Sequence, residues 1–180
     1  MHDSADGLLA NFRFLAQYNR WFNDRLYVAC EQLTDAERRR DRGAFFGSIH
    51  GSLNHIFWAD CLWLQRFASQ GRAFGALSGE LLRLPPGAVH GTVIHEEWLQ
   101  LRQARGALDG AIEAWVGEMP ADFPLSTMRY ANTKGVPREH PAWQAMAHFF
   151  NHQTHHRGQV TTLLSQAGID AGPTDLIALA

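Results

Sequence analysis

Residues 145–164 read AMAHFFNHQTHHRGQVTTLL and hold four of the chain's ten histidines. Apolar residues recur there at intervals of three and four, and no Pro or Gly interrupts the stretch before Gly158, so we predict an amphipathic helix. At about 100° per residue, His152 and His156 fall one turn apart on the apolar stripe, while His148 and His155 lie on its flank. The predicted helix therefore buries two histidines side by side.

A buried histidine pair has two interpretations. The rings could be core histidines that bond to buried polar groups, or they could be two ligands of a metal ion. Two imidazoles at positions i and i+4 of one helix can point at a common atom. A third histidine that faces the same core would favour the metal.

A second predicted helix, residues 46–69, supplies this third histidine. His55 lies on a stripe of small residues that leaves room beside its ring. His50 points to the opposite side of the helix, so we expect it to be exposed. Asp60 and Cys61 lie off the stripe, and we predict neither as a ligand; we expect Asp60 at the helix surface or behind the ligands.

We predict two further amphipathic helices, over about residues 4–33 and 92–117, because apolar residues are spaced three and four apart in each. Asn19 is the one polar residue in the apolar seam of the first. It could fix the packing register or donate a hydrogen bond toward the buried histidines, and the sequence leaves both roles open. We expect His95-Glu96-Glu97 to form the first turn of the later helix. Residues 70–89 and 119–141 are irregular, the latter with a small hairpin.

Four amphipathic helices predict an all-α fold, an up-down four-helix bundle or a variant with a crossover, in one domain over residues 1–180. If all seams face one core, His55 lies opposite His152 and His156. Three neutral imidazoles with the fourth position open are the ligand set of a catalytic zinc-type site. Imidazole suits zinc, nickel, copper and iron, so ligand type does not choose the metal. The carboxylate di-iron pattern is excluded because no Glu-x-x-His occurs.

Charge and hydropathy argue against two classes of binding partner, nucleic acids and membranes. A net charge of −2 and an isoelectric point near 6.5 give no basic footprint for nucleic acid. The N-terminus lacks the basic and apolar regions of a signal peptide, and no apolar stretch approaches the roughly 20 residues of a membrane span. We therefore expect a cytoplasmic protein that binds neither nucleic acid nor membranes.

The sequence resembles the DinB family of DinB/YfiT-like helical metal-binding proteins. The resemblance rests on YNRWFNDRL at 18–26, GSIHGSLNHIFWADCLWL at 47–64, NHQTHHRGQV at 151–160 and PTDLI at 173–177. It implies the same four-helix fold and one divalent metal, zinc or nickel with iron as a further choice. The implied ligands are His55, His152 and His156, the three that the helix geometry also selects.

The resemblance also implies an activity. Relatives in the wider superfamily resemble thiol-dependent transferases and a thiol-dependent isomerase, in which a metal ion would lower the pKa of a bound low-molecular-weight thiol. Without a thiol cofactor, the same site would suit a hydrolase. The alternative is a non-catalytic, stress-associated protein whose metal is structural, and a fourth protein ligand such as His148 or Asn19 would favour that alternative.

The sequence assigns no catalytic or cofactor-binding residue. Tyr18, Asn19, Tyr130 and Arg157 are candidates for a general base only by their position near the predicted core or in a motif. We expect the substrate to be a small molecule and the protein to be a homodimer, as members of the family often are.

Overall fold

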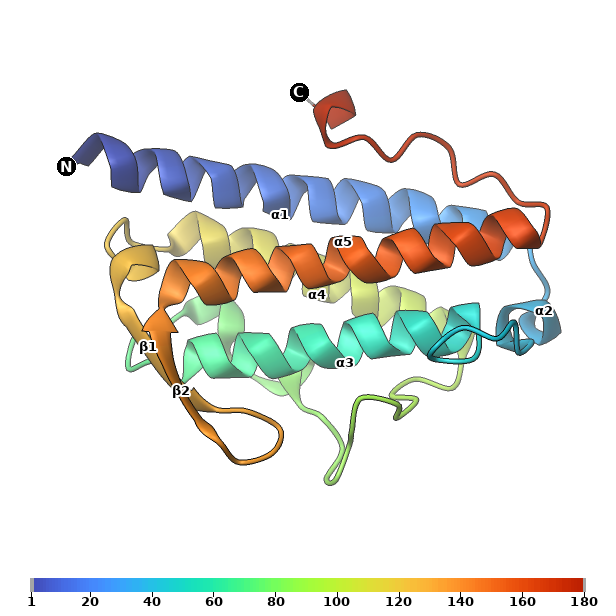
Figure 1. Ribbon diagram of the computed structural model, residues 1–180, viewed down its shortest axis with the longest axis horizontal. Coiled ribbons are helices and arrows are strands. Elements are labelled where there is room, and N and C mark those ends of the chain that lie inside the picture. Colours follow the sequence, from blue (N-terminus) through green and yellow to red (C-terminus); the bar gives the residue numbers. More distant parts are fainter. Residues whose placement is uncertain (1, 180) are drawn as a thin grey trace.

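Four long helices make up most of the structure, a computed structural model that describes residues 2–179 (Figure 1). They are α1 (His2–Glu31), α3 (Ile49–Ala68), α4 (Trp98–Glu118) and α5 (Ala142–Gln166). Strands β1 (Thr127–Ala131) and β2 (Pro137–Pro141) form the expected antiparallel hairpin. The short elements are α2 (Asp35–Arg39) and the 3-10 turns η1 (Gly75–Leu77), η2 (Glu80–Leu82), η3 (Phe123–Leu125) and η4 (Leu176–Leu179). The fold is mainly helical, as predicted.

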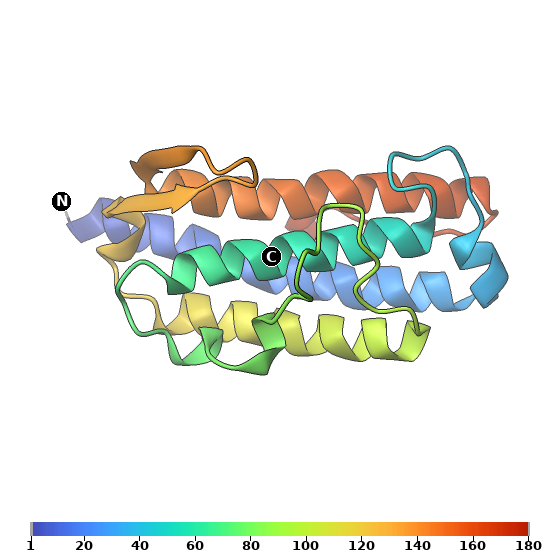
Figure 2. The ribbon, with the colours of Figure 1, turned by 90° about the horizontal axis from the view of Figure 1, so that it is seen from below.

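The four long helices do not alternate in direction. Figures 1 and 2 show α1 and α5 running one way and α3 and α4 running the other. Hydrogen bonds tie both ends of this parallel pair together: the Ala76 N–H, just after α3, bonds to Glu118 at the end of α4, and Asn54 near the start of α3 bonds to Ile94 before α4. Of the two expected arrangements, the plain up-down order is therefore not the one observed: residues 69–97 form a crossover between α3 and α4, because parallel neighbours need a long connection.

The helix expected from residue 92 begins six residues later, at Trp98. The side chain of Asn54 explains the difference, because its Oδ1 accepts the backbone N–H groups of Ile94 at 2.9 Å and His95 at 2.8 Å. These bonds hold the segment against α3 in a non-helical form. His95, Glu96 and Glu97 therefore precede the helix and do not form its first turn.

Local capping follows the sequence more closely. Thr34 and Glu37 form the reciprocal capping box that starts α2, and the Ser48 hydroxyl accepts the N–H of Gly51 at the start of α3. At the other end of the chain, Gly168 follows α5 with φ of 79°, a left-handed conformation that glycine adopts without steric cost.

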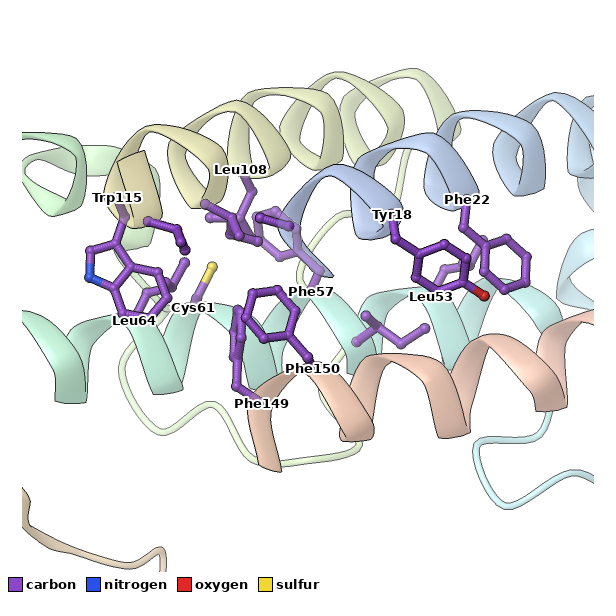
Figure 3. Packing of buried hydrophobic residues seen from close by; sticks show 14 of the residues in the cluster. Tyr18, Phe22, Leu53, Phe57, Cys61, Leu64, Leu108, Trp115, Phe149 and Phe150 are labelled. Carbon is purple, nitrogen blue, oxygen red and sulfur yellow. The ribbon is translucent and has the colours of Figure 1, made fainter. Parts of the chain in front are cut away.

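Aromatic side chains fill the core between the helices. Figure 3 shows Trp115 of α4 beside Leu64 and Cys61 of α3, with Phe149 and Phe150 of α5 nearby. Tyr18 and Phe22 of α1 lie further along the core. Trp115 stacks on Phe67 with 4.7 Å between ring centroids, and Phe149 meets both rings edge-on. Such offset and edge contacts stabilise aromatic cores beyond their buried area.

A buried polar network crosses this core. Asn19 Nδ2 donates to Asp109 of α4 at 2.7 Å, and Asn23 donates to the same carboxylate. Arg105 lies 2.6 Å from Asp60 of α3 and 2.8 Å from Asp109. Asn19 thus fixes the packing of α1 on α4 and does not bond to the histidines. Asp60 is only 1% exposed, so of its two expected positions the helix surface is wrong. Its carboxylate is buried because it pairs with Arg105 of the neighbouring helix.

Across residues 2–179, none of the helices is both long enough and apolar enough to cross a membrane.

Candidate metal centre

Three histidines from two helices lie close together in the structure. His55 comes from α3, and His152 and His156 come from α5. The Nε2 atoms of His55 and His152 lie 3.2 Å apart, and the three rings place ligand nitrogens within 4.8 Å of one another. The structure thus brings together the residues that the helix periodicity predicted to meet.

The second nitrogen of two of these rings has a hydrogen-bond acceptor. His55 Nδ1 lies 2.8 Å from the backbone carbonyl oxygen of His90, and His156 Nδ1 lies 2.8 Å from Oε1 of Gln159. An acceptor at Nδ1 favours a proton there and leaves the lone pair of Nε2 free for a metal. Neither acceptor was predicted from the sequence. The three-residue spacing of Gln159 from His156 was a usable signal, whereas nothing in the sequence marked the carbonyl of residue 90.

Burial keeps these imidazoles neutral. It lowers the pKa of His152 to about 3 and that of His55 to about 4, with a further contribution from neighbouring imidazoles, and it also lowers the pKa of His156. A metal competes with protons for histidine nitrogens, so rings that are neutral at pH 7 are ready to bind it.

The cluster contains no fourth histidine, cysteine or carboxylate among the residues that the structure describes. His148 and His155 are exposed beside it, and Asn19 is engaged by Asp109. Asp60 and Cys61 lie outside the cluster, as predicted. Three imidazoles with no further protein ligand match the donor set of open metal sites, so the residues present fit a divalent ion.

His50 does not lie where the sequence placed it. It is 2% exposed, and its Nε2 lies 3.0 Å from the carbonyl oxygen of His95. The expectation of an exposed ring failed because the segment before α4 covers this side of α3. That covering segment is distant in sequence, and the periodicity of α3 carries no information about it.

Aromatic rings and a cavity border the cluster. Phe46 stacks on His55 with 3.8 Å between centroids and meets His156 edge-on. A cavity of about 630 Å³ opens beside His152, between α3, α5, the crossover and the hairpin. Of the four candidates for a general base, Tyr130 lines this cavity.

The other three candidates, Tyr18, Asn19 and Arg157, form hydrogen bonds elsewhere in the structure. The Tyr18 hydroxyl donates to the carbonyl of Thr174 in the C-terminal segment. Arg157 is 1% exposed and donates to Asn19 inside the polar network.

The fold and the site define a class: helical proteins in which histidines from two helices form a cluster that could hold a metal ion beside a cavity. The chain matches the DinB family over residues 1–180, and it belongs to this family. Protein DinB of Bacillus subtilis (strain 168) is 23% identical over 168 residues, which cover 93% of this chain and 92% of that relative.

A solved structure has a similar fold. A DinB-like protein from Bacillus cereus ATCC 10987 superposes with a TM-score of 0.62 and 20% sequence identity, over 93% of this chain and 95% of the other. At that identity the likeness concerns the fold alone.

Proposed function

We propose that the protein is a metal-dependent enzyme that acts on a small molecule, with one divalent ion held by His55, His152 and His156. Zinc or nickel suits the site best, and iron is the further choice. The observation that carries the proposal is the meeting of the three rings beside a cavity of about 630 Å³, without a fourth ligand from the described residues. Catalytic metal sites keep a position open toward a pocket, whereas structural sites are closed by protein.

The ion would supply positive charge that lowers the pKa of a thiol or water at the open position. The chain's own residues would orient the imidazole rings and exclude water. His90 and Gln159 orient two of the rings, and Phe46 covers the His55 ring, so that water is excluded from that side. A thiol-dependent transferase or isomerase is the form we favour, and a hydrolase follows if no thiol enters. We further propose that the four long helices form one DinB-type bundle, modified by the crossover.

Substitution with cobalt tests whether the site is open. We expect the visible absorption of the Co²⁺ protein to change on addition of a low-molecular-weight thiol such as 2-mercaptoethanol, because an open position can accept a new ligand. The His55→Ala protein, treated identically, controls for cobalt bound elsewhere. A wild-type spectrum that stays the same at saturating thiol would indicate a closed site and a structural metal, and the enzyme proposal would then be dropped.

Gln159→Ala is expected to weaken zinc affinity roughly tenfold without abolishing binding, because outer hydrogen bonds to metal-binding histidines typically contribute 10–100-fold. Gln159 Oε1 is the acceptor that orients His156. Competition with a chromophoric chelator measures the affinity. Gln144→Ala, an exposed glutamine of the same helix, is the matched control and should bind as the wild type does. Equal affinities in all three proteins would contradict the orienting role.

A further inference from the structure

The cavity beside the histidine cluster contains a cation that the proposed function does not use. Arg66 lies on α3 about three helical turns after His55 and lines the cavity. Its guanidinium carbon lies 4.6 Å from the ring centroid of Trp63 and 4.8 Å from that of Tyr130. The planar group is therefore held at the cavity wall between α3 and the hairpin.

Among residues 6–179, whose side chains the structure describes, Arg66 has no acidic partner. No carboxylate lies within ion-pair distance of it, and none of the residues that line the cavity is acidic. Its guanidinium donates a hydrogen bond to the carbonyl oxygen of Ala131 at 3.4 Å. Burial lowers the pKa of Arg66, and the one neighbour that opposes this shift is Tyr130. The buried Arg105, in contrast, is paired with two carboxylates. The guanidinium of Arg66 is only half-buried, and its charge is available to an anion that enters the cavity.

The geometry of α3 directs Arg66 toward the cluster. Side chains on an α-helix lean toward its N-terminus, and the guanidinium indeed lies over Trp63, one turn earlier. Trp63 contacts His148 with 5.0 Å between ring centroids, and His148 lies 5.8 Å from His152 in the same measure. The rings of the cavity wall thus run without a break from Arg66 to the histidine cluster.

We propose that the cavity binds a small organic monocarboxylate with a flat, unsaturated or aromatic body, its carboxylate on Arg66 and its other end toward the histidines. The guanidinium fork matches a carboxylate through two parallel hydrogen bonds. Arg66 is the only arginine or lysine among the described residues that line the cavity, so at this end, about three helical turns from the proposed metal, one negative charge is balanced. The aromatic walls favour a flat body. This inference rests on the proposed function, since it assigns a substrate class to the same site.

Calorimetry with trans-cinnamate as the probe, and its neutral isostere cinnamamide beside it, tests the proposal. We expect cinnamate to bind the wild-type protein about tenfold more tightly than cinnamamide does, because a charge-assisted pair adds at least that much. Arg66→Gln should remove this preference and leave cinnamamide unchanged. Arg83→Gln, an exposed arginine of the crossover, is the matched control and should keep the preference. Circular dichroism confirms that each variant is folded.

Each contrary outcome overturns the inference. It fails if cinnamate and cinnamamide bind the wild type equally, a comparison that requires no variant. It also fails if Arg66→Gln binds cinnamate as the wild type does, or if no saturable binding occurs up to about 10 mM. If phenylphosphonate binds more tightly than cinnamate, the cavity prefers a dianion and the monocarboxylate proposal is wrong. The outcome is separable from that of the metal proposal, because carboxylate binding should persist in His55→Ala and zinc binding should persist in Arg66→Gln.

Discussion

We expect the wild-type protein to purify with about one divalent ion per chain, and His152→Ala to purify without it. The ring of His152 contacts both other histidines of the cluster: its centroid lies 5.1 Å from that of His55 and 4.3 Å from that of His156, and its Nε2 lies 3.2 Å from that of His55. Removing one of three ligands should weaken binding by more than the roughly 10–100-fold that loss of an outer hydrogen bond causes. Elemental analysis of protein purified without an affinity tag or chelator measures the effect directly.

His155→Ala is the matched control for that experiment. It removes an imidazole from the same helix, but His155 is exposed and lies outside the cluster, so metal content should not change. His50 is less suitable, because its buried ring bonds to the backbone before α4. Equal metal content in the His152 and His155 variants would rule out the ligand assignment. If the wild type has no metal and its melting temperature does not respond to zinc or nickel, the histidines are structural.

Asp109→Ala is expected to lower the free energy of unfolding by about 3–5 kcal/mol, the usual cost of removing one partner of a buried ion pair. The Asp109 carboxylate is 1% exposed, accepts hydrogen bonds from Asn19 and Asn23, and lies 2.8 Å from Arg105. Without it, those donors remain buried with fewer acceptors, and the charge of Arg105 is left to Asp60 alone. Urea unfolding followed by circular dichroism gives the difference.

Glu113→Ala provides the comparison on the same helix. Glu113 also pairs with an α1 residue, Arg20, but the two side chains are 30% and 48% exposed, so the loss should be at most about 1 kcal/mol. Similar losses for the two variants would contradict the importance of burial. If Asp109→Ala proves as stable as the wild type, the network does not hold α1 to α4.

Much of the fold could be predicted because helical periodicity is a local property. The spacing of apolar residues placed the long helices, and the caps at the start of α2 and the end of α5 are likewise made by nearby residues. The same periodicity put His55, His152 and His156 on faces that turn inward. It failed at residues 92–97, because the side chain of Asn54, about 40 residues away along the chain, holds this segment out of the helix.

The sequence by itself determined the four long helices and the helix faces that carry His55, His152 and His156, since helical periodicity depends on residues within a few turns of one another. The tertiary structure alone decided that α3 and α4 run parallel, that Asp60 pairs with Arg105, that His50 is covered, and that Arg66 lines a cavity beside the histidine cluster. These features depend on contacts between segments distant in sequence. Periodicity specifies which face of a helix is apolar, but the partner of that face is fixed only when the whole core packs.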